Sequence, residues 1–329
     1  MNKLVRAAQT SQSLSLAAME EASRLGLREA DIEHLFLALV ISDQSAGRAL
    51  RSMGISLDAA RQAVEEQREA QLASLGIDAS FPEAGRIVFH ETDGYEWSPR
   101  ARALIAKSSG RNKSGAAAAV LRGLVAEPSG LITEILDRLG TSSDALLKQL
   151  DQFDSPAETT TPAAEKVKGR ISGSSETFVS APMEKVWEFL ADPTRIPEWE
   201  PSLGSIEHSE QEATVGAVWQ GFAPTSHPNG KPVKIKPQFR RRSIELVAVL
   251  RPERIAWSFA HPDVGRSRSV LTEFTLVSAT GGTQVQITKS WPRRQGWRSL
   301  VALPLRPIQK FLVWITLFQT GSAVSRAFR

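Results

Sequence analysis

Large aromatic and basic side chains gather in the second half of this 329-residue sequence, at spacings that could line a ligand site. The aromatic candidates are Trp199, Trp219, Trp257, Phe259, Trp291 and Trp297. The polar candidates are Arg240, His261 and Arg268. Aromatic walls with a few polar groups are typical of pockets for hydrophobic molecules, and an arginine there could bind the carboxylate or phosphate of an amphiphile. The alternative is that most of these aromatic residues pack a core.

The residue types argue against a reaction centre. The sequence has no cysteine, which excludes disulfides, thiolate metal ligands and a cysteine nucleophile. Its histidines are scattered, without the His–carboxylate spacing of a metal site, and there is no G-x-S-x-G nucleophile motif or G-x-x-x-x-G-K-[ST] phosphate-binding loop. We therefore expect no catalytic residue, no metal and no cofactor, and a binding protein rather than an enzyme.

Charge is distributed unevenly along the chain. Residues 1–154 hold 17 Lys and Arg against 21 Asp and Glu, whereas residues 155–329 hold 23 against 15, so the halves differ in sign. Three basic clusters stand out in the second half, "FRRRS" (239–243), "GRSRS" (265–269) and "WPRRQGWR" (291–298). They could form a solvated basic face or contact anionic lipid. No groove-reading motif accompanies them, so nucleic acid is not an expected partner.

Neither end of the sequence predicts export or membrane insertion. The first residues meet Glu20 and Glu21 before any unbroken apolar run, unlike a signal peptide. The apolar segment "FLVWITLF" (311–318) is much shorter than the roughly 20 residues that cross a bilayer. We expect a cytoplasmic protein.

The first half has a helical pattern that occurs twice. Residues 33–64 align with residues 118–150, and both copies contain a Met-Gly or Leu-Gly helix end followed by serine. Glycine can adopt the left-handed conformation that ends a helix, and the serine can cap the next one. Two sets of short amphipathic helices that bury their apolar stripes against each other are predicted.

This half resembles the Clp amino-terminal domain, the double helical repeat at the front of the Clp unfoldases. The resemblance lies in "AAMEEASRLGLREADIEHLFLAL" (17–39) and "WSPRARALI" (97–105) and covers about 1–154. It implies recognition of a Clp-system protein or a peptide. In some members a glutamate in each repeat binds arginine-phosphorylated proteins; Glu33 matches the first position, but the second falls near Ala118, which has no carboxylate.

Residues 155–174 are rich in Pro, Thr, Ser and Gly and predict a flexible linker, followed by an α+β domain over 175–329. A strand at 176–181 precedes two short helices. Further strands are expected at 203–209, 216–223, 233–249, 254–260, 269–278 and 283–291, before a helix from about Gln295 to Phe328 bent at Pro304 and Pro307. On a strand through 233–249, Arg240 and Arg242 share one face and Arg241 takes the other.

This order, with "SAPMEKVWEFLADPTRIPEW" (180–199) and "TGGTQVQIT" (280–288), resembles the START-like helix-grip superfamily and its polyketide cyclase/dehydrase members over about 175–320. The resemblance implies a curved antiparallel sheet around a long carboxy-terminal helix, with a hydrophobic ligand or lipid bound between them.

The sequence thus predicts a non-catalytic protein that joins a partner-recognition module to a domain that binds a hydrophobic small molecule. One version is a decoy that sequesters peptides directed at a Clp unfoldase. A polyketide cyclase-like enzyme and a protein that binds anionic membrane surfaces remain the alternatives.

Overall fold

The computed structural model describes residues 3–77, 85, 87, 94–109, 116–154, 170–209, 211–226, 230–265, 269–292 and 306–329. Side chains of the long first and last helices are described from Thr10 onward and from Val313 onward. The chain divides into two compact units, Met1–Ala157 and Glu158–Arg329. The expected flexibility of the linker concerns residues 155–169, which lie outside the described residues. Its expected end at 174 is wrong, because strand β3 already begins at Arg170 and pairs along its length with β9.

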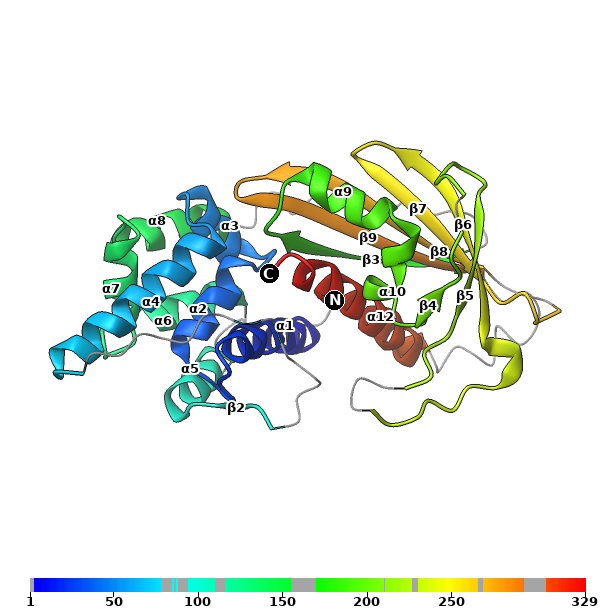
Figure 1. Ribbon diagram of the computed structural model, residues 1–329. Helices are drawn as coiled ribbons and strands as arrows, with labels where there is room; N and C mark the ends of the chain where they lie inside the picture. Colours follow the sequence, from blue (N-terminus) through cyan, green and yellow to red (C-terminus); the bar gives the residue numbers. More distant parts are fainter. Residues whose placement is uncertain are drawn as a thin grey trace. The chain divides into compact units, whose positions relative to one another are not determined.

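The first unit is helical and contains the predicted repeat (Figure 1). The first copy consists of α1 (Lys3–Arg24), α2 (Ile32–Val40), α3 (Ser45–Ser52) and α4 (Leu57–Ser74), and the second of α5 (Pro99–Ser109), α6 (Ala117–Val125), α7 (Leu131–Arg138) and α8 (Ser143–Asp154). Two short parallel strands, β1 (Glu29–Ala30) and β2 (Glu96–Trp97), join the copies.

The predicted helix boundaries have the expected physical basis. Gly54 and Gly140 follow α3 and α7 with φ of 82° and 71°, a left-handed conformation that glycine adopts without steric cost. The Ser56 hydroxyl then accepts a hydrogen bond from Ala59 N, and the Ser142 hydroxyl accepts one from Ala145 N. Helix α2 is buried on every side, so the repeats pack around it.

The second unit is an antiparallel sheet with helices on one face. Its elements are β3 (Arg170–Val179), α9 (Met183–Ala191), η1 (Pro193–Arg195), α10 (Ile196–Trp199), β4 (Ser205–Ile206), β5 (Val218–Phe222), η2 (Pro237–Phe239), β6 (Arg241–Leu250), β7 (Arg254–Ala260), β8 (Val270–Ala279), β9 (Gly282–Pro292) and α12 (Arg306–Arg326). The strand order is β3-β9-β8-β7-β6-β5-β4. The elements occur in the order strand, short helices, strands and long helix. This order confirms the helix-grip fold.

One predicted strand is wrong in its first half. Strand β6 starts at Arg241, whereas residues 233–240 contain loop and the short helix η2 around Pro237. Proline lacks the N–H that a ladder requires, and its fixed φ favours a turn here. Pro307 lies in the first turn of α12, where proline is tolerated. Residues 293–305 lie outside the described residues. The expected helix start near Gln295 and the expected bend at Pro304 fall in this range.

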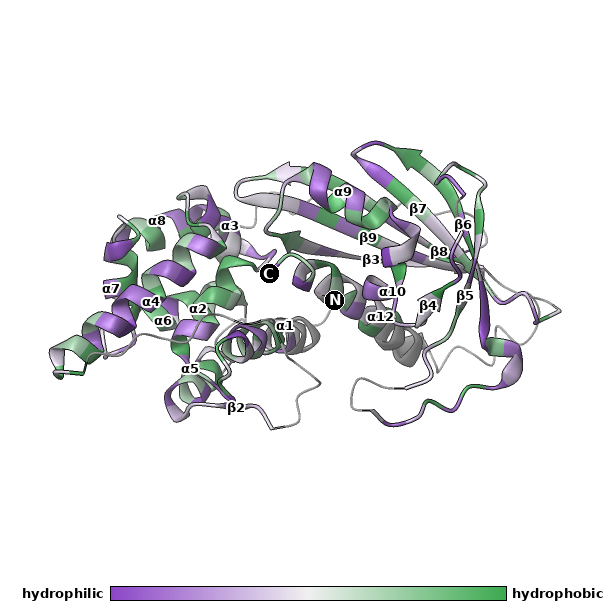
Figure 2. Cartoon of the chain, in the orientation of Figure 1, coloured by the Kyte–Doolittle hydropathy of each residue, from purple (hydrophilic) through white to green (hydrophobic). Residues whose placement is uncertain are grey.

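Alternation along the strands gives the sheet an inner and an outer face, and Figure 2 shows hydrophobic and hydrophilic residues alternating along them. The inner face carries buried residues such as Phe274 and Ile287, and α9, α10 and α12 pack against it. Helix α12 approaches β3 closely: a Cβ on Gly173 would meet Val313 Cγ1 at 2.4 Å, so glycine is needed for this contact.

Candidate functional site

Strand register places the inner-face side chains in cross-strand rows. One row runs Lys289–Thr272–Trp257–Leu246 across β9, β8, β7 and β6. Another runs through Val270, Phe259, Ile244 and Trp219. Side chains directly opposite one another on antiparallel strands contact each other, so each row is a continuous strip. Two of the four residues of the first strip, Lys289 and Thr272, are polar and buried, so this end of the strip is a candidate for a site.

Lys289 forms a buried ion pair with Glu200, which follows α10. Their Nζ and Oε2 atoms are 2.8 Å apart, and the two side chains are only 4% and 9% exposed. Glu200 Oε1 also accepts a hydrogen bond from Ser202 N. Burial of an ion pair costs desolvation energy that its attraction barely repays, so a buried pair on an apolar face is a weak means of stabilising a fold.

Two further polar atoms, on residues that neighbour this pair in strand register or in sequence, are buried without a hydrogen-bond partner in the described part of the chain. They are the Thr272 hydroxyl and Trp199 Nε1. Thr272 lies directly opposite Lys289, and Trp199 immediately precedes Glu200. The Trp199 ring packs against Phe274 and Phe259, at centroid distances of 5.0 and 6.1 Å. An unmade hydrogen bond at a buried donor costs about 1–3 kcal/mol, so these positions suit a bound polar atom.

Arg242 and His261 extend the polar groups of the inner face. Arg242 Nη1 donates to the carbonyl of Phe239 at 2.8 Å and contacts the His261 ring, with 3.0 Å to Nε2. Burial, and secondarily the Arg242 charge, lower the pKa of His261 below its ordinary value. Burial also lowers the pKa of Arg242, against the opposing influence of the Glu200 carboxylate. We call Glu200, Arg242, His261, Thr272 and Lys289 the polar cluster.

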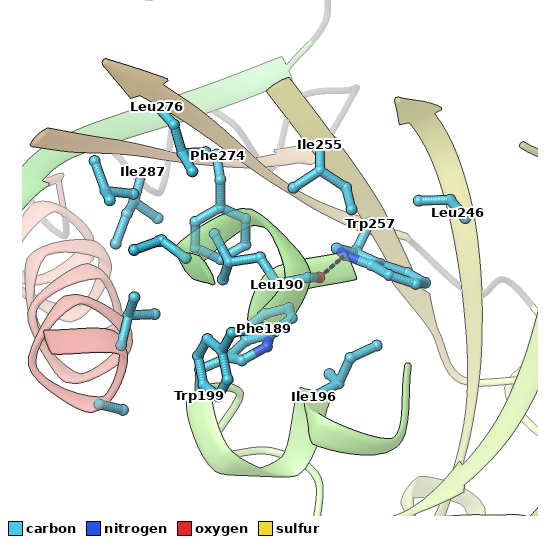
Figure 3. Close-up of a cluster of buried hydrophobic side chains, with 14 of the residues drawn as sticks. Phe189, Leu190, Ile196, Trp199, Leu246, Ile255, Trp257, Phe274, Leu276 and Ile287 are labelled. Atoms are coloured by element: carbon cyan, nitrogen blue, oxygen red, sulfur yellow. Dashed lines mark hydrogen bonds between the residues drawn. The ribbon is translucent and has the colours of Figure 1, made fainter. Parts of the chain in front are cut away.

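Four of the aromatic residues predicted for a ligand site lie in the core. Trp199 and Trp257 are completely buried, and Trp219 and Phe259 are 3% and 6% exposed. Trp257 Nε1 donates to the carbonyl of Leu190 at 3.0 Å, which fixes its ring between the sheet and α9 (Figure 3). These rings pack edge to face with one another, as in the pair Trp219–Trp257. These four residues are therefore core residues of the second unit.

The remaining predicted residues are not part of this aromatic core. Trp291 is half-buried on β9 opposite Ile171, which is 44% exposed. Arg240 is exposed in the turn after η2, so the expected strand face does not include it; the inward arginine is Arg242. Arg268 and Trp297 lie outside the described residues. His261 is beside Arg242 as described above.

Sequence reasoning missed Lys289, Glu200 and Thr272. A signal for Lys289 was available in "VQITKSW", where it alternates with Val285 and Ile287 and so takes the buried face. No comparable signal identified Glu200, because its partner is 89 positions away in the sequence.

Glu33, the expected partner-binding residue, is buried in the first unit. Its side chain is 5% exposed and forms ion pairs with Arg68 and, at 3.5 Å, with Arg100. Asp31 caps α2 and binds the same Arg100, with Nε 2.8 Å from both carboxylate oxygens. Burial raises the pKa of Asp31, but hydrogen bonds from Arg100 and Ser98 outweigh this effect and lower it.

The two repeats differ at this position. Glu33 is the second residue of α2, and Ala118 is the second residue of α6, where it is 1% exposed. The equivalence expected from sequence is therefore present in the structure, and the second repeat offers a methyl group where the first has a carboxylate.

Comparison with known families identifies both units. Residues 7–82 match the Clp repeat (R) N-terminal domain. Residues 170–309 match the family described as polyketide cyclase / dehydrase and lipid transport. The chain is thus a fusion of a Clp amino-terminal region with a polyketide cyclase-like helix-grip domain.

Solved structures are similar to about half of the chain. Protein CV1439 from Chromobacterium violaceum is 20% identical, with 48% of this chain and 99% of that chain covered and a TM-score of 0.32. The Polyketide_cyc-like protein Cgl2372 from Corynebacterium glutamicum is 16% identical, with 49% and 93% covered and a TM-score of 0.32. Protein Ms6760 from Mycobacterium smegmatis is 16% identical, with 48% and 90% covered and a TM-score of 0.31. No curated protein matches the chain significantly.

Two searches of the described residues were negative. None of their helices is long and apolar enough to span a membrane. They also contain no group of three or more His, Asp or Glu side chains arranged to hold a metal ion.

Proposed function

We propose that this protein is a non-catalytic, cytoplasmic binding protein whose helix-grip domain holds a hydrophobic small molecule or lipid and whose Clp-type unit recognises a protein or peptide. The observation that carries the ligand proposal is the polar cluster on an otherwise apolar inner face. Among the described residues, the buried donors of Thr272 and Trp199 have no hydrogen-bond partner, which favours an additional polar atom there. The family description, which includes lipid transport, supports the same class of ligand.

Binding is favoured over catalysis because the titratable groups of the polar cluster are engaged with one another. The Glu200 carboxylate binds the Lys289 ammonium, and the His261 ring contacts the Arg242 guanidinium. A general base must be within reach of a substrate proton and free to accept it. If a cyclase-like reaction occurred instead, turnover with a pH-dependent rate would be observed.

Native mass spectrometry of freshly purified full-length protein tests the ligand proposal. We expect a small-molecule adduct on the 35.9 kDa chain that is released on denaturation. Val270→Phe adds bulk to the inner face beside Phe259 and should abolish the adduct. Leu271→Phe adds the same ring to the neighbouring outward position of β8 and should keep it. Equal adducts on both folded variants would place the molecule elsewhere.

For the first unit we propose a protein or peptide partner of the Clp type. A peptide decoy function fits a recognition module without a phosphate-binding loop. An arginine-phosphorylated partner is less favoured, because its guanidinium would have to displace Arg68 or Arg100 from Glu33, and the second repeat has only Ala118. We expect weak binding of an arginine-phosphorylated peptide at most. Tight binding that is lost in Glu33→Ala would reverse this preference.

A further inference from the structure

The guanidinium of Arg242 differs from those of three other arginines of the helix-grip domain in what its Nε–Nη2 edge meets. Arg241, Arg254 and Arg195 each use Nε and Nη2 to hold a carboxylate, on Asp263, Glu273 and Glu198 respectively. This two-point geometry is the strongest that arginine makes with a carboxylate. In the part of the chain that the structure describes, the hydrogen bonds of Arg242 all use Nη1, and its Nε and Nη2 meet no carboxylate.

The environment of Arg242 distinguishes it from a solvated surface arginine. The residue is half-buried, lies on the inner face opposite Gly221, and loses enough hydration for its pKa to fall. The Glu200 carboxylate opposes the fall in the pKa of Arg242, but this carboxylate is already bonded to Lys289. Because a half-buried cation without a counter-ion is costly, this position favours a negative partner.

The charge balance of the polar cluster also favours a partner with a negative charge. With His261 neutral, the polar cluster contains two cations, Arg242 and Lys289, and one anion, Glu200. One further negative charge makes the cluster neutral, whereas two would reverse the imbalance. An apolar surface adjoins the guanidinium, since the Phe239 ring is 37% exposed and packs against His261 at 5.0 Å.

We propose that Arg242 binds the carboxylate of a monoanionic amphiphile through its Nε–Nη2 edge, so that the ligand of the helix-grip domain is a hydrophobic carboxylic acid. This inference rests on the proposed ligand-binding function and specifies its chemical class. Arg242 sets the preference for the charged head, and the apolar inner face receives the rest of the molecule.

Calorimetric titration of the full-length protein with decanoate and with decanol tests the assignment, because the two probes share an alkyl chain and differ in the head. We expect decanoate to bind the wild type more tightly. Arg242→Gln should weaken decanoate about tenfold or more, the usual scale for a charge-assisted hydrogen bond, and leave decanol within about twofold. Arg240→Gln removes the same charge from the exposed neighbouring turn and should change neither affinity.

The possible outcomes distinguish the carboxylate site at Arg242 from the proposed binding of a hydrophobic ligand in general. If decanoate binds no better than decanol, or if Arg240→Gln and Arg242→Gln weaken it equally, the carboxylate site is wrong while hydrophobic binding stands. If neither probe binds the wild type and no adduct is found, the proposed function fails as well. Arg242→Lys provides a check if the glutamine variant does not fold: it keeps the charge but not the planar fork, so decanoate should lose part of its advantage.

Discussion

The two units of this protein bury ion pairs in different surroundings. In the helical unit, Glu33 contacts Arg68 and Arg100, and Arg100 also binds the capping residue Asp31, so the charges connect α2 and α4 of the first repeat copy with α5 of the second. In the helix-grip unit, the Lys289–Glu200 pair has Thr272 opposite Lys289 and Trp199 next to Glu200 in the sequence, and the hydroxyl and the indole N–H of these two residues have no hydrogen-bond partner in the described part of the chain. Buried polar atoms without a hydrogen-bond partner in the described residues occur in both units, since Glu33 Oε2 and His34 Nε2 are among them as well. The two regions differ in their pairing. The Glu33 carboxylate is shared between two arginines from different helices, whereas Lys289 and Glu200 form a single pair on a largely apolar sheet face.

The largest effect is expected from breaking the Lys289 pair. Lys289→Met leaves Glu200 buried without a counter-ion and should lower the free energy of unfolding of the second unit by about 3–5 kcal/mol. The double variant Lys289→Met/Glu200→Gln should recover most of this loss, because it removes both charges. Tryptophan fluorescence during urea unfolding reports on this unit, since all of the eight tryptophans except Trp97 belong to it. A single variant as stable as the wild type would show that water reaches Glu200.

The next largest effect is expected at two glycines, one in each unit, where the chain packs closely against its neighbours. A Cβ on Gly47 in α3 would lie 2.0 Å from the Ser42 carbonyl oxygen, whereas one on Gly173 in β3 would meet the Val313 side chain. Overpacking usually costs about 1–3 kcal/mol. We expect Gly47→Ala to reach or exceed the upper end, because backbone cannot withdraw, and Gly173→Ala to cost less.

Calorimetric melting of both variants checks this order, and Val313→Ala should relieve Gly173→Ala but not Gly47→Ala. If Val313→Ala does not restore the stability of Gly173→Ala, β3 and α12 do not approach each other this closely.

A smaller, graded effect is expected from pH in the helical unit. His34 Nδ1 accepts a hydrogen bond from Asp31 N at 3.0 Å, and burial lowers its pKa below the ordinary value of 6.5. Since the unfolded chain takes up the proton first, stability should fall as pH decreases through 6.5 and level off below the folded pKa. Glutamine makes the same cap contact without titrating, so His34→Gln should remove this slope. Hydrogen exchange of the α2 amides at about pH 7 and pH 5 measures it; an unchanged slope would assign the effect to another group.

The smallest effect is expected on the outer face of the sheet. Arg254 and Glu273 form an ion pair there with 2.8 Å between Nε and Oε1, but the side chains are 51% and 24% exposed. Exposed pairs usually contribute about 0.2–1 kcal/mol. Glu273→Gln should therefore change urea stability by less than about 1 kcal/mol. A loss comparable to that of Lys289→Met would remove the distinction between inner and outer pairs.

The sequence by itself determined the element order, the double helical repeat and the two families, because these depend on local signals. Apolar periodicity, Gly54 and Gly140 at helix ends, and alternation in the strands act within a few residues of each other. The tertiary structure decided which side chains form the site. The short helix that begins at Pro237 delays the start of the expected strand to Arg241, so Arg240 is left in a turn and Arg242 is the inward arginine. Glu200 meets Lys289 only because α10 packs on the inner face, and the same packing turns Trp199 and Trp257 into core residues. Such contacts join residues far apart in the chain, where periodicity carries no information about the partner.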